Sequence, residues 1–295
     1  MSLQIKLRGT GVALVTPFHA NGSIDFKSLE NVINHVINNG CEYVVTLGTT
    51  GETPVLNKEE KIELIEFTYS IVDGRIPVVV GVGGNDTNAL IKDLHSFPLE
   101  KAIAILSAGP YYSKPSQEGI YQHYKALAKE TSKPIILYNV PGRTGKSIEA
   151  STTLRLANEV ENIVGIKEAS GDFTLCMKLL KDKPKDFLVV SGDDLLAMAQ
   201  IACGMEGVIS VAANCLPASF SEMVRLSLKG DFANAKTIND SMLEAYELLF
   251  CENNPAGVKA FLVELGLIQN NLRLPLVTLS SEVHQKIKNY LLASK

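Results

Sequence analysis

The chain has 295 residues, of which 46% are hydrophobic and 20% are charged, and 28 basic against 32 acidic side chains give a net charge of -4. These values are ordinary for a globular protein with a sizeable core, and the length allows one large domain or two smaller ones. The mildly acidic balance without basic clusters offers no electrostatic footprint for nucleic acid or for an anionic membrane surface, so we expect small-molecule partners.

The N-terminal stretch "MSLQIKLRGTGVALVTPF" has too short an apolar segment before Pro17 for a secretory signal, and no apolar run reaches the length of a membrane span. The five cysteines are odd in number and lie in apolar surroundings without a recurring spacing, which is typical of reduced core thiols rather than disulfides. The five histidines are scattered too, and neither residue type offers a metal-ligand spacing. We therefore expect a cytoplasmic protein without a metal site.

Eight short runs rich in β-branched residues recur along the chain, and each predicts a buried strand. They cover residues 11–17, 42–48, 76–83, 102–108, 134–140, 163–169, 186–192 and 207–213. The stretches between them, such as "SLENVINHVINNG" and "KEEKIELIEFTYSIVDG", carry apolar residues at three- and four-residue spacing, which predicts amphipathic helices. Near-continuous apolar strands that alternate with helices indicate a parallel sheet covered on both faces. Eight such units in about 230 residues fit an α/β fold of the (β/α)8 TIM-barrel type better than an open sheet.

From about residue 231 the sequence predicts helices only, in the stretches "FANAKTINDSMLEAYELLF", "AGVKAFLVELGL" and "SEVHQKIKNYLLA". No linker rich in Pro, Gly or Ser separates them from the barrel. We therefore expect a barrel domain at residues 1–230 and a C-terminal helical domain at residues 231–295 that packs on it.

Polar residues gather where the predicted strands end, which is the face of a barrel where active sites form. They lie in the segments "GTTGE" (48–52), "GPYY" (109–112), "YNVPGR" (138–143) and "SGDD" (191–194), together with Lys167 on the sixth strand. Each segment alone could serve turn geometry or cap the next helix. Their convergence on one face favours a binding site.

Lys167 lies inside the apolar run "IVGIKEA", although lysine is rarely buried without a partner. A salt bridge to Glu168, or a side chain that snorkels at the barrel rim, would explain it without any function. The functional interpretation is a Schiff-base nucleophile, because burial disfavours the charged ammonium and leaves more free amine to attack a carbonyl carbon. Tyr138 on the neighbouring strand offers a phenol for proton transfer, and "GTTGE" offers backbone N–H groups and two hydroxyls for a substrate carboxylate.

In this order, "GTTGE", "YNVPGRTG", "GIKEASGD" and "SGDD" resemble the pyruvate-dependent class I aldolase and lyase family, and the resemblance covers essentially the whole chain. Similar segments include "GPYYSKPSQEGIYQHYKALA" and "NPAGVKAFLVELGL". The resemblance implies a lyase that condenses pyruvate with L-aspartate 4-semialdehyde through a lysine Schiff base, in the diaminopimelate route of lysine biosynthesis. It also implies a homotetramer built as a pair of tight dimers, and it implies no metal or organic cofactor.

The resemblance further implies a role for each matching residue of the site. Lys167 would form the imine with pyruvate, and Tyr138 would relay protons. Thr49 and Thr50 would hold the pyruvate carboxylate. Thr50 would also link Tyr138 to Tyr112, which in this family reaches across the tight dimer into the neighbouring active site.

The second substrate distinguishes the branches of the family. Arg143 matches the arginine that holds the carboxylate of aspartate semialdehyde, while Gly192 and Ile209 would line the site through their backbones. Sialic acid lyases and 2-keto-3-deoxygluconate-type aldolases share the lysine and the tyrosine but generally lack this arginine, so Arg143 favours the aspartate-semialdehyde branch. A barrel that serves only as a binding or scaffold protein would keep the core pattern but would need neither Lys167 nor Tyr138.

Overall fold

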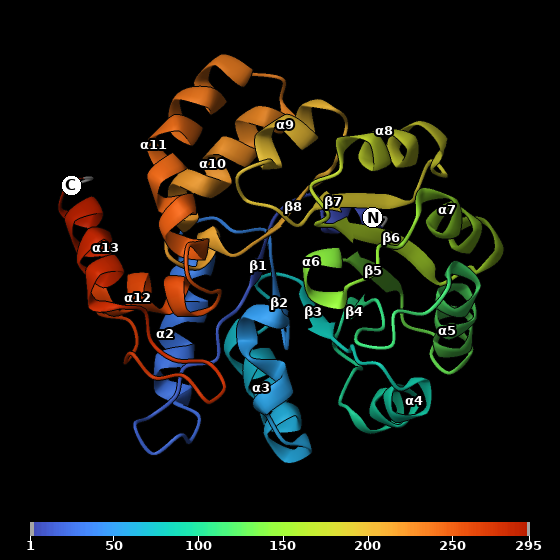
Figure 1. Ribbon diagram of the computed structural model, residues 1–295, viewed down its shortest axis with the longest axis horizontal. Helices are drawn as coiled ribbons and strands as arrows, with labels where there is room; N and C mark the ends of the chain where they lie inside the picture. Colours follow the sequence, from blue (N-terminus) through green and yellow to red (C-terminus); the bar gives the residue numbers. More distant parts are fainter. Residues whose placement is uncertain (1–2, 294–295) are drawn as a thin grey trace.

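The computed structural model describes residues 3–293, in which eight parallel strands close into a barrel in the order β1 to β8. The strands are β1 (Gly9–Ala13), β2 (Tyr43–Thr46), β3 (Val78–Gly81), β4 (Ala104–Ala108), β5 (Ile135–Asn139), β6 (Ile163–Glu168), β7 (Leu188–Ser191) and β8 (Gly207–Ser210). Figure 1 shows the helices arranged around them. Each predicted strand is present, and the predicted α/β barrel is confirmed.

Helices precede β1, lie between successive strands and follow β8, and most of them cover the outside of the barrel. They are α1 (Leu3–Lys6), α2 (Phe26–Asn38), α3 (Lys58–Val72), α4 (Thr87–Ser96), α5 (Gln117–Lys129), α6 (Pro141–Thr144), α7 (Ala150–Glu159), α8 (Phe173–Asp182), α9 (Ala197–Ala202) and α10 (Pro217–Leu228). Three short 3₁₀ turns, η1 (Thr49–Gly51), η2 (Thr53–Val55) and η3 (Ala212–Asn214), follow β2 and β8. Because all the strands are parallel, these loops after the strands meet at one end of the barrel.

The first strand differs from its predicted range, since it begins at Gly9 and ends at Ala13. Gly9 and Gly11 have low strand propensity, but pairing with β2 and β8 places them in the ladder. The ladder ends because the backbone N–H of Val15 donates to Asn214 Oδ1 at 3.3 Å instead of to a neighbouring strand. Pairing with β2 and β8, and not the apolar pattern of the sequence, therefore decides where β1 begins and ends.

Apolar side chains cover the sheet on both faces, as expected for a parallel barrel. One cluster fills the barrel interior and includes Ala13, Tyr43, Val45, Val79, Leu106, Ile136, Tyr138, Val190 and Ile209. A larger cluster lies between the strands and the surrounding helices and continues into the C-terminal helices. The near-continuous apolar character of the strands in the sequence follows from this burial on both sides.

The C-terminal region forms the three predicted helices, α11 (Phe232–Phe250), α12 (Ala256–Glu264) and α13 (Ser281–Ala293). α11 packs on α10, and the three helices pack on one another at one side of the barrel (Figure 1). Gly257 lets α12 approach α11 closely, because a side-chain carbon there would lie 2.2 Å from the carbonyl oxygen of Leu249.

The domain division at residue 231 stays a prediction, and residues 1–2 and 294–295 of the two predicted ranges lie outside the described residues. Within the described part of the chain, we find no helix with the length and apolarity that a bilayer crossing requires.

Candidate active site

A cavity of about 370 Å³ lies at the end of the barrel where the strands terminate. Its wall includes six of the eight side chains or backbones that the sequence singled out, namely Thr49, Thr50, Tyr138, Arg143, Lys167 and Gly192. The other lining residues are Ala13, Gly48, Leu106, Val140, Gly142, Ala169, Val211, Phe250 and Asn254. Motifs that are far apart in the sequence thus meet in one small enclosure, as the barrel topology requires.

Lys167 and Tyr138 are paired neighbours on β6 and β5. Lys167 is only 5% exposed, and its Nζ lies 4.3 Å from the centroid of the Tyr138 ring. Within residues 3–293 this ammonium group has neither a carboxylate nor a hydrogen-bond acceptor as partner. An amine that is buried, close to a phenol and free of a counter-ion is suited to attack a carbonyl carbon.

Glu168 does not form the salt bridge with Lys167 that would have explained the buried lysine without a function. Successive residues of a strand point to opposite faces, so Glu168 lies outside the barrel interior. Its carboxylate accepts hydrogen bonds from Asn139 Nδ2 at 2.8 Å and from the backbone N–H of Ser170 at 2.6 Å. Burial raises the pKa of Glu168, and these two donors oppose that rise. Glu168 therefore fixes the ends of β5 and β6 and leaves Lys167 unpaired.

The segment "GTTGE" (48–52) contains η1 and ends with Glu52, the residue between η1 and η2, and it does not cap the next helix. The cap of α3 is Asn57, whose side chain accepts from the backbone N–H of Glu60 at 2.8 Å. Thr50 is 2% exposed, and its Oγ1 accepts a hydrogen bond from Asn254 Nδ2 at 3.3 Å. Thr16 Oγ1 holds the same turn by donating to the carbonyl oxygen of Gly51 at 2.7 Å. The turn thus presents Thr49 and Thr50 to the cavity from a fixed position.

Arg143 lies on the single-turn helix α6, directly after β5. Its guanidinium donates to the carbonyl oxygen of Asn254 at 3.3 Å and lines the cavity. It also lines an adjoining cavity of about 450 Å³, whose wall includes Lys61 and Tyr111. A guanidinium at this junction can hold a carboxylate through two parallel hydrogen bonds.

Gly192 and Ile209 take different places in the structure. A side-chain carbon at Gly192 would lie 2.8 Å from Lys167 Cε and 2.6 Å from Ala169 Cβ, so a glycine is needed where Lys167 passes. Ile209 is 1% exposed and packs in the barrel interior, whereas Val211 forms the cavity wall after β8. The backbone role expected for Ile209 stays a prediction.

Tyr112 is the one predicted site residue that lies far out on the surface of a single chain. It is 90% exposed and adopts a left-handed backbone conformation with φ 70° in the loop after β4. Its neighbour Tyr111 lines the adjoining cavity instead. One chain therefore brings together the lysine, the tyrosine, the threonines and the arginine but not Tyr112.

Sequence reasoning missed Asn254 and Phe250, which reach the cavity from the C-terminal region. Asn254 bridges Thr50 and Arg143 through its amide and its carbonyl oxygen. The only signal was the polar "ENNP" between two helical stretches, and such a segment reads first as a turn.

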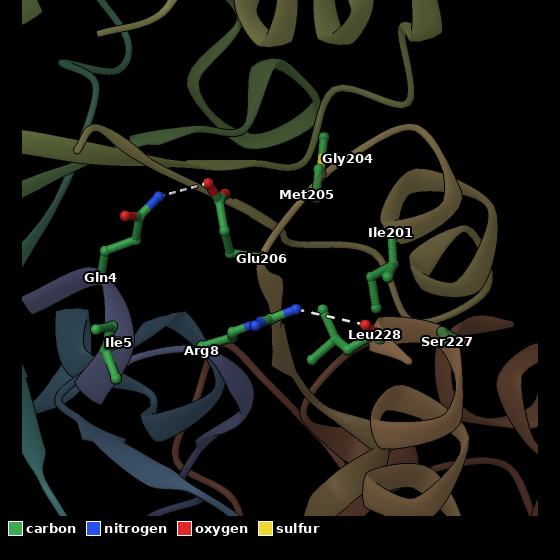
Figure 2. A pocket seen from close by; sticks show the side chains of 9 residues that line it. All are labelled: Gln4, Ile5, Arg8, Ile201, Gly204, Met205, Glu206, Ser227 and Leu228. Carbon is green, nitrogen blue, oxygen red and sulfur yellow. Dashed lines mark hydrogen bonds between the residues drawn. The ribbon is translucent and has the colours of Figure 1, made fainter. Parts of the chain in front are cut away.

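A further cavity of about 320 Å³ lies at the opposite end of the barrel, beside α1 (Figure 2). Its polar side chains are engaged with one another or with the backbone: Gln4 donates to Glu206 at 2.8 Å, and Arg8 donates to the carbonyl oxygen of Leu228 at 3.4 Å. Glu206 also pairs with Lys183 at 2.8 Å. This cavity holds none of the residues that the sequence singled out, so we assign the chemistry to the other end. Across residues 3–293, no three His, Cys, Asp or Glu side chains are grouped so that they could hold a metal ion.

The sequence and the fold are similar to those of known proteins. Residues 6–294 match the Dihydrodipicolinate synthetase family. The chain is 51% identical to a 4-hydroxy-tetrahydrodipicolinate synthase from Azobacteroides pseudotrichonymphae over 289 residues. This matched region covers 98% of each chain. The fold superposes on a dihydrodipicolinate synthase from Aquifex aeolicus with a TM-score of 0.94 and 38% identity, over 98% of both chains. It also superposes on the chloride-inhibited synthase from Acinetobacter baumannii complexed with pyruvate, with a TM-score of 0.94 and 41% identity, over 97% of this chain and 98% of that chain. The chain therefore belongs to the dihydrodipicolinate synthetase family.

Proposed function

We propose that this chain is a 4-hydroxy-tetrahydrodipicolinate synthase, a lyase that condenses pyruvate with L-aspartate 4-semialdehyde through an imine on Lys167. The observation that carries the proposal is the unpaired, buried amine of Lys167 beside the Tyr138 ring, in a cavity that also contains hydroxyl groups and a guanidinium. A silent barrel would not need an unpaired ammonium group in its interior. The relative from Acinetobacter baumannii was solved with pyruvate, which supports the choice of first substrate.

The reaction begins when Lys167 Nζ, as the free amine, attacks the keto carbon of pyruvate, and loss of water leaves an iminium. The iminium withdraws electrons, so that a proton can leave the methyl carbon and form an enamine. The enamine carbon attacks the aldehyde carbon of aspartate semialdehyde. The amino group of this second substrate then closes onto the imine carbon and releases Lys167. Tyr138 serves as the acid and base of these proton transfers, since it borders the same cavity as Lys167.

Thr49 and Thr50 hold the pyruvate carboxylate. They begin a 3₁₀ turn, and the first N–H groups of such a turn have no acceptor within it, so they are free to donate to an anion. Asn254 already donates to Thr50 Oγ1, which leaves the hydroxyl proton of Thr50 to point to another acceptor. We assign this hydroxyl to the proton relay between Tyr138 and Tyr112 of a neighbouring subunit.

The family to which the chain belongs supports a proposal for its assembly and its compartment. We infer a homotetramer built from two tight dimers, in which the exposed Tyr112 completes the site of the adjacent subunit. We place the enzyme in the cytoplasm, because all five cysteines are free thiols, which suits a reducing compartment.

Reduction with borohydride in the presence of pyruvate tests the imine directly. The wild-type chain should gain the mass of one reduced pyruvate adduct, and peptide mapping should locate the adduct at Lys167. Lys167→Ala should gain none and should retain its circular dichroism spectrum. An unchanged wild-type mass, or an adduct on another lysine, would contradict the proposal.

Arg143→Ala tests the second substrate and separates the synthase from the aldolases of the same family. We expect pyruvate trapping to stay within about twofold of the wild type, while the KM for aspartate semialdehyde should rise by about tenfold or more, because a bidentate charged hydrogen bond is lost. Initial rates at varied concentrations of each substrate measure both effects. Equal loss of pyruvate trapping and of condensation would assign Arg143 a structural role instead.

A further inference from the structure

Glu52, the last residue of "GTTGE", adopts a left-handed backbone conformation with φ 54° and ψ 32° between η1 and η2. A residue with a side chain adopts this conformation at an energetic cost, and it persists only where its surroundings fix it. The backbone N–H of Glu52 donates to the carbonyl oxygen of Thr49 at 3.2 Å, and its own carbonyl oxygen accepts from Val55 at 3.0 Å. The conformation of Glu52 therefore determines how the turn with Thr49 and Thr50 enters the cavity.

The side chain of Glu52 is fully buried and forms an ion pair with Lys259 of α12, which is fully buried as well. The second carboxylate oxygen of Glu52 accepts from the backbone N–H of Arg273 at 3.1 Å. Lys259 Nζ also donates to the carbonyl oxygen of Asn271 at 2.9 Å and lies 4.4 Å from the centroid of the Phe18 ring. Both charges are thus compensated by several partners, as buried charges must be.

The C-terminal region also holds the far end of the same turn. The Arg273 guanidinium donates to the carbonyl oxygen of Val55 at 2.9 Å and to both carboxylate oxygens of Glu60, at 2.8 and 2.5 Å. Together with the hydrogen bond from Asn254 to Thr50, the region after α11 contacts the turn at its start, its middle and its end. These contacts join residues that are more than 200 positions apart in the sequence.

We propose that the buried Glu52–Lys259 pair positions the carboxylate-binding turn, so that α12 contributes to pyruvate affinity without touching the substrate. This inference rests on the proposed function, because it assumes that Thr49 and Thr50 hold the pyruvate carboxylate. A small displacement of a group that orients the substrate strongly weakens binding and catalysis, even when the substituted residue lies outside the cavity. Glu52 and Lys259 are accordingly positioning residues.

Two variants test the role. Glu52→Gln with Lys259→Met removes both charges at nearly constant volume, so that no lone charge remains buried. Glu52→Gln alone keeps an acceptor in place, because the amide oxygen can still accept from Lys259 or from the Arg273 N–H. It also removes the counter-charge of Lys259, whose pKa burial already lowers to about 8, so that this amine can lose its proton. The readout is borohydride trapping of pyruvate over a range of pyruvate concentrations. The half-saturating concentration should rise by about tenfold in the double variant and by a smaller factor in Glu52→Gln, while the rate at saturating pyruvate falls less.

A matched control uses the same substitutions at the opposite end of the barrel. Lys183 and Glu206 also form a largely buried ion pair at 2.8 Å, and Glu206 lines the cavity beside α1 (Figure 2). Lys183→Met with Glu206→Gln should leave the half-saturating pyruvate concentration within about twofold of the wild type, because this pair contacts no part of the turn.

The inference is overturned if the Glu52 variants that fold keep the wild-type pyruvate dependence. It is also overturned if the control pair shifts that dependence equally. Should the double variant fail to fold, Glu52→Gln decides alone. A wild-type chain that traps no pyruvate would overturn the proposed function itself, which separates that failure from a failure of the positioning role.

Discussion

Gly192 illustrates how a single missing side chain shapes the site. Lys167 crosses the space that a side chain at position 192 would occupy, with Cε 2.8 Å from the position of an added carbon. That separation is shorter than any normal contact, and the other close neighbour, Ala169 Cβ, is attached directly to the backbone. The lysine side chain would therefore have to move.

Gly192→Ala should reduce the rate of imine formation by about tenfold to a hundredfold, since a small displacement of a reacting group has effects of that size. Rapid borohydride trapping with pyruvate measures it. Gly142→Ala is the matched control, because Gly142 lines the same cavity but an added carbon there meets nothing within 4 Å. Equal trapping rates in Gly192→Ala and the wild type would show that Lys167 reaches pyruvate by another path.

Among single residues, those whose chemistry conflicted with their surroundings were the ones that could be predicted from the sequence. Lys167 in an apolar strand is such a conflict, and the structure places it at the cavity with the neighbouring Tyr138. Asn254 and Glu52 gave no such signal, because an asparagine before a proline and a glutamate in a loop are ordinary. Their roles depend on partners that are distant in the sequence, which no local pattern contains.

At the scale of elements, Asp194 joins the ends of β7 and β8. It is 3% exposed, and its Oδ2 accepts from the backbone N–H groups of Val211 at 3.1 Å and Ala212 at 2.8 Å, where η3 begins. Burial raises the pKa of Asp194 to about 6, although these hydrogen bonds oppose the rise. The carboxyl group is therefore easier to protonate in the folded chain than in the unfolded chain.

This raised pKa predicts a pH-dependent stability with a definite sign. Because the ordinary value is 3.8, the contribution of Asp194 is fully present below about pH 4 and is lost as the pH rises through about 6. Asp194→Asn cannot titrate, so the free energy of unfolding of the wild type relative to this variant should fall by about 1–2 kcal/mol between about pH 5 and about pH 8. Urea unfolding of both proteins at the two pH values measures the difference. A difference that is constant or grows with pH would contradict the raised pKa.

The elements themselves were predictable where a periodic pattern coincides with burial. α11 and α13 begin and end where their stretches predicted, and all eight strands lie within or near their apolar runs. β1 begins at Gly9, earlier than its apolar run predicted, because pairing with β2 and β8 and not strand propensity decides its position. The attachment of α12 to the turn after β2 was not predictable, since it depends on which faces meet once the barrel has closed.

For the whole molecule, the exposed position of Tyr112 leads us to predict that one chain does not contain a complete site. The cavity of the single chain already gathers Lys167, Tyr138 and Arg143, whereas Tyr112 is 90% exposed on a loop with a left-handed backbone. A large aromatic side chain in that state is typical of an interface. In a two-fold dimer each subunit would give its Tyr112 to the other, because such an interface is the same in both directions.

Complementation between two impaired variants tests this exchange. In a mixed dimer of Tyr112→Phe and Lys167→Ala chains, the site with an intact Lys167 receives an intact Tyr112 from its partner, while the other site lacks both. Random reassembly of equal amounts makes about half of the dimers mixed, so the recovered activity should approach about a quarter of the wild-type value. Condensation rates before and after dissociation and reassembly measure the recovery, and native mass spectrometry confirms that mixed dimers formed. If Tyr112 acts within its own chain, neither site of a mixed dimer holds both residues, and verified mixed dimers will show no gain over the separate variants.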